Sequence, residues 1–199
     1  MKYRSDLATL AAGVATVAVL FVIGCTEPTT PKVSSPLRNR LAGHSQSPGT
    51  GKPMSVEDQQ LLAAIRAATA GFQNVDVARA AGYVDDGFGC IADPDLGGMG
   101  WHLINDALHA DPATDPLRPD LLVYEPQPNG HLKLVALEYE VYQDDWHRAG
   151  NVAPPTLLGH EFEAVDFPPL PLIFGLHVWL WRENPSGMFA DFNPKVSCP

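Results

Sequence analysis

Proline and glycine limit the fold of this chain more than any other feature, with 19 prolines and 17 glycines among 199 residues. Proline removes a backbone donor and breaks helices, and glycine permits turns and ends helices. Their frequency argues against a helical bundle and a coiled coil. Hydrophobic residues make up 45% of the chain and charged residues 18%, so one buried core is still expected. The length fits a single domain with short elements and long loops.

An apolar run without charged residues covers residues 7–24 and follows the basic residues Lys2 and Arg4. A basic segment followed by an apolar segment and a small residue is typical of a secretory signal peptide. A short transmembrane anchor is the alternative, because a run of 18 residues is near the lower limit for a bilayer span.

The end of this run, Val22-Ile23-Gly24-Cys25, resembles the lipobox of bacterial lipoproteins. The resemblance implies that the chain is cut before Cys25 and that acyl chains are attached to its sulfur and its new amino group. Several acyl chains make a lasting membrane anchor. We therefore expect residues 1–24 to be a lipoprotein signal peptide and the protein to be exported and lipid-anchored to the cell envelope. Thr26 stands where many inner-membrane lipoproteins have Asp, which favours the outer membrane if there are two.

The chain has three cysteines, which is an odd number for an exported protein. With Cys25 as the lipid site, Cys90 and Cys198 remain, and we expect a disulfide between them in an oxidising compartment. Two free buried thiols are the alternative. Closing a loop of roughly a hundred residues stabilises a fold by about 4 kcal/mol in the chain-entropy model.

Residues 25–54 are rich in Pro, Ser, Thr and Gly and show no apolar periodicity, which predicts a flexible tether after the lipidated cysteine. Six of the 13 basic residues and two of the 23 acidic residues precede Ser55. Residues 55–199, the expected globular domain, thus carry 7 basic and 21 acidic side chains and a net charge of -14. This charge repels phosphate backbones and argues against nucleic-acid binding.

Two helices are expected at the start of this domain. Ser55 is placed to cap the first helix, and Asn74 is placed to cap a short second helix over residues 75–81. Residues 83–120 are rich in Gly, Asp and Pro, so we expect a long loop with at most a helical turn or two over residues 101–109. Long ordered loops often carry function.

Strands are expected after this loop. Residues 121–125 and 132–142 flank an Asn129-Gly130 turn, which predicts an antiparallel hairpin in which Leu121 faces Glu138 and Tyr124 faces Val135. A later strand over residues 176–181 can extend back to Ile173 and Phe174. The expected fold class is α+β, with two N-terminal helices packed on a small antiparallel sheet with long Gly/Pro-rich loops.

Three residues are candidates for a metal or ligand site. Strand alternation places Glu138 among apolar residues and His177 on one face with Trp179 and Trp181. His102 follows the glycine-rich residues 97–100, which we expect to form a turn that permits close approach of the backbone. Two imidazoles and one carboxylate are a recurrent ligand set for a divalent transition-metal ion. We expect these three side chains to line a pocket between the glycine loop and the sheet.

Neighbouring residues are candidates for orienting these ligands. Asn105 and Asp106 lie three and four residues after His102, so on a helical turn either is placed to orient it, and Trp179 neighbours His177. The alternative is that all three candidates are structural, with His177 bonded to a backbone carbonyl and Glu138 paired with an arginine. The expected arginine partners are Arg148 and Arg182.

The other histidines of the domain have weaker signals. We expect four of them at the surface, although His160 is ambiguous because leucines precede it and Phe162 follows: His109, His131, His147 and His160.

Other catalytic templates fit poorly. The chain has no G-x-S-x-G nucleophile elbow, and the glycine cluster at 97–100 lacks the Lys-Ser/Thr of a phosphate-binding loop. Cys90 and Cys198 are too far apart in sequence for a C-x-x-C redox site.

Several motifs resemble a family of uncharacterised exported bacterial proteins. They are GGMGxHxxN at 97–105, LxYEP at 122–126, EY at 138–139 and LHxWxWxxNPxGMF at 176–189. The resemblance spans most of residues 60–198 and implies export and a common fold, but it supplies no catalytic role. Its pattern includes His102, Glu138 and His177.

These observations predict a lipid-anchored cell-envelope protein whose acidic domain binds a small ligand or a metal ion without catalysis. One alternative is a metal-dependent enzyme that uses the same site, with Glu138 or Asp106 as general base. A purely structural or interaction module is the other alternative. The sequence leaves open whether the protein is an enzyme.

Overall fold

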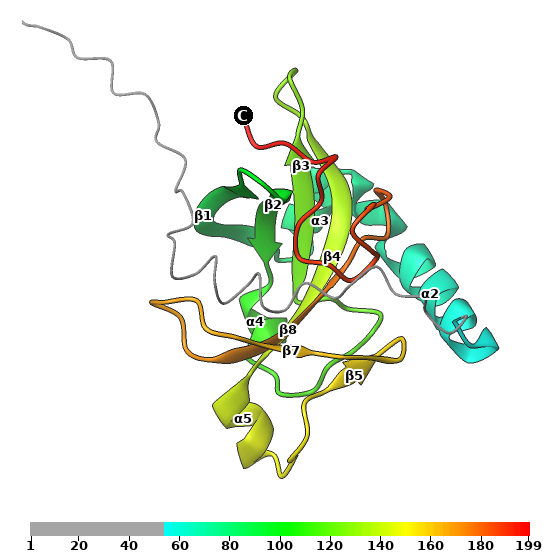
Figure 1. The fold of residues 1–199 in the computed structure, drawn as a ribbon, viewed down its shortest axis with the longest axis vertical. Coiled ribbons are helices and arrows are strands. Elements are labelled where there is room, and N and C mark those ends of the chain that lie inside the picture. The colour runs from blue at the N-terminus through cyan, green and yellow to red at the C-terminus, as the bar shows by residue number, and fades with distance from the viewer. Residues whose placement is uncertain (1–53) are drawn as a thin grey trace, which may run out of the picture.

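A computed structural model describes residues 54–199, coloured in Figure 1. The predicted signal peptide, the lipid site at Cys25 and the tether up to residue 53 lie outside the described residues. Within residues 54–199, no helix combines the length and apolarity needed to cross a bilayer. The predicted mixture of helices and antiparallel sheet is confirmed, since six strands form one curled sheet in the order β1-β2-β3-β4-β8-β7.

The main helices precede the sheet. Helix α2 spans Val56–Thr69, a short 3-10 helix η2 spans Ala70–Gln73 and helix α3 spans Val75–Ala80. The Ser55 side chain accepts from the Asp58 N–H, and the Asn74 side chain accepts from the Asp76 N–H, so each cap satisfies a first-turn donor. Apolar residues of these helices contribute to the main core against one face of the sheet.

The strands and smaller helices are β1 Val84–Asp93, β2 Gly97–Ile104, α4 Asp106–His109, β3 Leu121–Pro126, β4 Leu132–Tyr142, α5 Gln143–Arg148, β5 Thr156–Leu157, β6 His160–Glu161, β7 Glu163–Val165 and β8 Ile173–Val178. Strands β5 and β6 form a separate two-stranded sheet.

The prediction that residues 83–120 form a loop is wrong for its first half, which contains strands β1 and β2. The pairing of β1 with β2 is irregular between Asp85 and Cys90, where two glycines with positive φ lie. Such a bulge hides the apolar alternation by which a strand is recognised in sequence. Residues 97–100 therefore belong to a strand and not to a loop beside the pocket.

The hairpin of β3 and β4 agrees with the prediction at one end only. Leu121 pairs with Glu138 as expected, but a bulge shifts the register so that Tyr124 pairs with Leu134 and not with Val135. The turn is also wider than two residues, since the Gln127 N–H donates to the His131 carbonyl. Because β4 has one extra residue at the bulge, residues 132–134 on the turn side of it pair one position away from the predicted register.

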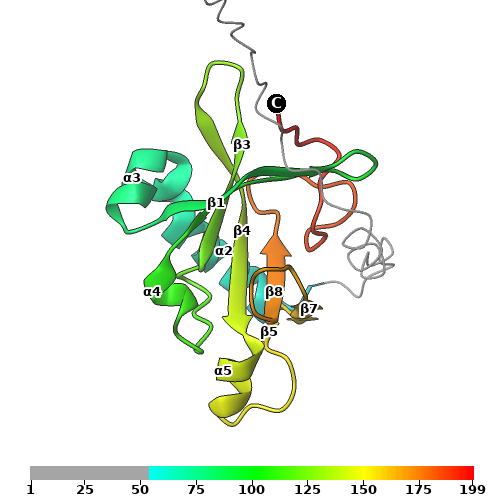
Figure 2. The same cartoon turned by 90° about the vertical axis from the view of Figure 1, so that its left-hand side faces the viewer.

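Two apolar clusters lie on opposite faces of the sheet. The larger one is formed with the helices, and the smaller one is formed with the C-terminal segment by Val123, Val135, Ala136, Trp179 and Val196. Figure 2 shows α3 on one side of the sheet and the red C-terminal segment on the other.

The C-terminal segment is held at two places. The predicted disulfide between Cys90 and Cys198 is confirmed and joins β1 to the end of the chain. The Gly98 N–H donates to the carbonyls of Asn193 and Val196, and a Cβ at Gly98 would lie 2.7 Å from Val196 Cγ1. The glycine thus permits close approach, as expected, but of the chain's own C-terminal segment.

Candidate metal centre

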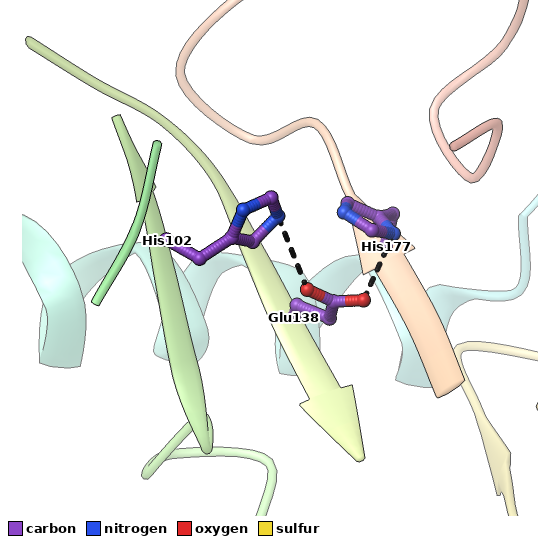
Figure 3. A group of neighbouring side chains, drawn as sticks. All are labelled: His102, Glu138 and His177. Carbon is purple, nitrogen blue, oxygen red and sulfur yellow. Dashed lines mark ion pairs between the residues drawn. The ribbon is translucent and has the colours of Figure 1, made fainter. Parts of the chain in front are cut away.

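The three predicted ligands come from three strands of the large sheet and point toward one another (Figure 3). Glu138 of β4 lies directly opposite His177 of β8 in the antiparallel ladder. His102 of β2 pairs with Val123 of β3, so one strand separates it from Glu138. Neighbouring strands are about 4.8 Å apart, and the curl of the sheet brings His102 toward the other two. One potential ligand atom from each residue lies within 4.8 Å of the others.

Glu138 lies between the two imidazoles. Its Oε2 is 3.4 Å from His102 Nε2, and its Oε1 is 3.2 Å from His177 Nδ1. The two rings meet edge to face, with their centroids 5.8 Å apart. All three residues are buried, with exposed fractions of 2% for His102, 8% for Glu138 and 3% for His177.

The arginine pairings considered for Glu138 are wrong. Arg148 pairs with Asp145 on helix α5, and Arg182 lies 3.8 Å from the carboxylate of Glu125. The register places Glu138 on the same face as His102 and His177, and its carboxylate lies closest to these two imidazoles.

Burial determines the charge state of the site. It lowers the pKa of His102 to about 4, and burial together with the charge of His102 lowers the pKa of His177 to about 3. Burial also raises the pKa of Glu138 well above its usual value, with the charges of Glu140, Asp191 and Asp86 adding to the effect. Both imidazoles are therefore neutral near pH 7, which is the form that binds metal.

The imidazoles retain unused polar atoms. Within the part of the chain that the structure describes, Nδ1 and Nε2 of His102 and Nε2 of His177 have no hydrogen-bond partner of acceptable geometry. Buried polar atoms without partners are costly and rare in native proteins. Binding of an ion by one nitrogen of each ring would offset part of this cost.

Two further carboxylates lie beside the imidazoles. Asp86 Oδ2 is 3.9 Å from His102 Nδ1, and Asp191 Oδ1 is 3.7 Å from His177 Nδ1. Burial raises the pKa of Asp86 to about 6, although the N–H of Phe88 partly opposes this. A carboxylate on the far nitrogen of the ring, as Asp86 is for His102, orients a metal-bound imidazole in many metalloproteins, whereas Asp191 lies near the same nitrogen of His177 as Glu138 does. The sequence prediction missed both residues, because each lies in irregular sequence without a periodic signal.

The predicted supporting roles of Asn105 and Asp106 assumed that His102 begins a helical turn. This assumption is wrong, because His102 lies in strand β2, which ends at Ile104, so Asn105 and Asp106 are not on a helical turn with it. Asn105 instead caps α4: its side chain accepts from the Leu108 N–H and donates to the Ala81 carbonyl. Asp106 lines the cavity described below.

Trp179 is the nearest aromatic neighbour of His177 along the chain. Its ring is stacked on that of His177 at 6.4 Å and 19°, and its indole N–H donates to the Ala190 carbonyl. Trp181, predicted on the same face, instead packs against the main core, because β8 ends at Val178 and strand alternation stops there.

His109 was expected at the surface and is buried. Its Nε2 lies 3.1 Å from Glu140 Oε2, and its ring lies 4.5 Å from that of Tyr142. The short helix α4 packs against β4, and no local pattern in the sequence reveals that contact. His131 and His147 are exposed as expected, and His160 is half-buried against Phe189.

A cavity of about 310 Å³ borders the three ligands. Residues of β1, β2, β4 and β8, the segment between β7 and β8, and the C-terminal segment line it. The predicted location between a glycine loop and the sheet is corrected accordingly, since Gly97 and Gly98 face the C-terminal segment and Gly100 faces β3.

No protein-family model matches the chain, and neither does any curated protein or solved structure.

Proposed function

We propose that this protein is exported, anchored to the cell envelope by acyl chains on Cys25, and binds a divalent transition-metal ion through His102, Glu138 and His177. The observation that carries the metal site is the convergence of three buried ligand atoms within 4.8 Å of one another. Imidazole and carboxylate together suit zinc, iron, nickel and copper better than the oxygen-seeking calcium and magnesium ions.

The spacing of the ligand atoms is compatible with an ion bound between them. Zinc binds nitrogen and oxygen at about 2.0–2.2 Å, so its ligand atoms lie roughly 3–4 Å apart. The distances of 3.4 Å from Glu138 to His102 and 3.2 Å from Glu138 to His177 lie in this range, and all three ligand atoms lie within 4.8 Å of one another. The neutral imidazoles and the carboxylate also match the ligand set of many catalytic metal sites.

The proposed location rests on the N-terminal sequence and on the disulfide. The order of basic segment, apolar run and Cys25 supports export and acylation. The bond between Cys90 and Cys198 fits an oxidising compartment, because disulfides are rare where thiols are kept reduced.

A metal-dependent enzyme is the second candidate function, and one observation favours it. The cavity reaches the three ligands, so a fourth position on the ion would be open to a small molecule. Open positions are typical of catalytic sites, whereas structural zinc sites are closed. Glu138 would then be a metal ligand and could not act as the general base. Of the two residues predicted as general base, Asp106 is the one that remains.

Metal analysis of protein purified without added metal tests the site. We expect about one transition-metal ion per chain by mass spectrometry, as one triad provides one site. His102→Ala or His177→Ala should weaken Zn²⁺ binding by more than about 100-fold. This loss is larger than the one caused by removing a residue that only hydrogen-bonds a metal ligand. His131→Ala, which changes an exposed histidine, is the matched control and should bind as the wild type does.

The site would be disproved by native protein that carries no metal above background and binds neither added Zn²⁺ nor added Co²⁺. Addition of imidazole to the Co²⁺ form shows whether a coordination position on the ion is open. A changed visible spectrum indicates an open position, and an unchanged spectrum indicates a closed structural site.

A further inference from the structure

We propose that the cavity beside the metal centre admits uncharged molecules that combine an apolar body with one oxygen or nitrogen donor, and that it excludes anions. This inference rests on the proposed function, because the donor atom would occupy the open position on the ion. It adds the class of molecule that reaches the ion.

The apolar walls of the cavity favour a ligand with an apolar body. Apolar side chains line it from β1, β2, β8, the segment between β7 and β8, and the C-terminal segment. Phe88 of β1 and Phe167 of the β7–β8 segment meet edge to face at 5.2 Å, so they join two walls. A volume of about 310 Å³ is at the lower end for small-molecule sites. A compact aromatic or branched aliphatic body matches these dimensions.

The charges around the cavity disfavour an anion. The ionisable residues that line it are six carboxylic acids, three histidines and Tyr142, and none of the described lining residues is Lys or Arg. The acids are Asp85, Asp86, Asp106, Glu138, Glu140 and Asp191. An anion entering this cavity would lose its hydration without gaining a cationic side chain, which is costly.

The metal ion itself disfavours a cation as the group that binds it. A divalent ion held by one carboxylate and two neutral imidazoles retains a positive charge, which repels an ammonium group placed at the open position. The carboxylates of Asp86 and Asp191 lie beside the two imidazoles and weaken the attraction of the ion for an incoming anion. A neutral donor, such as an amide, carbonyl or hydroxyl oxygen, avoids both penalties.

Three probes with the same aromatic body test this proposal on the Co²⁺-loaded full chain. They are neutral 1-naphthylacetamide, anionic 1-naphthylacetate and cationic 1-naphthylmethylammonium. The visible spectrum of Co²⁺ is the readout, because it reports only molecules that reach the ion. We expect a saturable spectral change with the amide, and binding of the acetate weaker by at least about tenfold because its charge is buried among carboxylates.

Two leucines of one segment provide a matched pair of variants. Leu170 lines the cavity, whereas Leu172 does not line it and is 52% exposed. Leu170→Glu should weaken amide binding by at least about tenfold, because it places a carboxylate on an apolar wall. Leu172→Glu should bind the amide as the wild type does. Both variants should retain Co²⁺, which verifies that the metal site is still formed.

The outcomes separate this inference from the proposed function. Bound Co²⁺ with equal or tighter binding of the acetate or the ammonium probe overturns the inference and leaves the metal site intact. Bound Co²⁺ without any effect of the amide also overturns the inference alone. Absence of Co²⁺ binding by the wild type overturns the metal site, and this inference with it.

Discussion

Buried ionisable residues extend from the metal centre toward helix α4. Glu140 contacts His109, and its backbone N–H donates to Asp120 Oδ2 at 3.0 Å. Burial lowers the pKa of His109, but the contact with Glu140 and the charges of Asp120 and Asp106 outweigh it and raise the pKa. Burial raises the pKa of Asp120 to about 6, although the Glu140 N–H opposes this. Because folding shifts the pKa values of these side chains, the free energy of unfolding depends on pH.

Asp120→Asn should change how stability depends on pH. The pKa of Asp120 is about 6 in the folded state, whereas an unperturbed aspartate has a pKa of 3.8. Its contribution is therefore fully present below pH 3.8 and is lost as pH rises through 6, by up to about 3 kcal/mol. Asparagine does not ionise, so the variant should gain in unfolding free energy relative to the wild type between pH 4 and about 7. Urea unfolding of both proteins across this range measures the difference.

The difference in unfolding free energy between the wild type and Asp120→Asn reports Asp120 alone, although other groups change stability in the opposite direction. The lowered pKa values of His102 and His177 act in the opposite direction, because stability from neutral buried imidazoles is lost as pH falls below their unfolded value. They are present in both proteins and cancel in the comparison. A difference that stays constant with pH would show that Asp120 does not titrate as described.

The C-terminal segment crosses strand β2 at a glycine, and this contact closes one side of the sheet. A Cβ at Gly98 would lie 2.7 Å from Val196 Cγ1 and 2.8 Å from the Val196 carbonyl oxygen. The backbone of the segment would have to move to admit it. The packing of the smaller apolar cluster depends on this approach.

Gly98→Ala should lower the unfolding free energy by about 1–3 kcal/mol, the usual cost of overpacking. Thermal and urea unfolding measure the change. Gly71→Ala is the control, because its Cβ would lie 3.9 Å from the nearest atom and should be nearly neutral. Equal stability of the two variants would contradict the close approach of Val196.

The disulfide connects β1 to the end of the chain across 108 residues. Replacement of Cys90 and Cys198 by serine should lower the unfolding free energy by about 4–5 kcal/mol, because a long loop gains the most entropy when it is opened. Urea unfolding of the double variant and the wild type measures this loss. Cys25→Ser leaves the bond intact and is the control. A loss below about 1 kcal/mol would indicate that other contacts already hold the segment.

At the scale of the whole molecule, we propose that a lipid anchor holds the acidic domain at the membrane. Cys25→Ser should yield protein without acyl chains, because the acylated sulfur is removed. Mass spectrometry of the purified chains measures this. The Cys90 and Cys198 double variant should keep its acyl chains and serves as the control. Acylation that persists in Cys25→Ser would refute the lipid anchor.

Local signals in the sequence determined several elements of this protein. Ser55 and Asn74 occur where α2 and α3 begin, and residues 132–142 form β4 with the predicted bounds. The pairing of Leu121 with Glu138 and the bond between Cys90 and Cys198 also followed from the sequence. Such features depend on residues a few positions apart, or on the few residues of one chemical type.

Tertiary structure alone decided the surroundings of the metal centre. Strands β1 and β2 lack clear alternation and are defined by pairing along the sheet and by the C-terminal segment. Their position brings Asp86 near His102, and the C-terminal segment brings Asp191 near His177. The bulge in the hairpin and the burial of His109 likewise depend on contacts between distant residues. Sequence periodicity reports which face of an element is apolar, whereas long-range packing decides what that face meets.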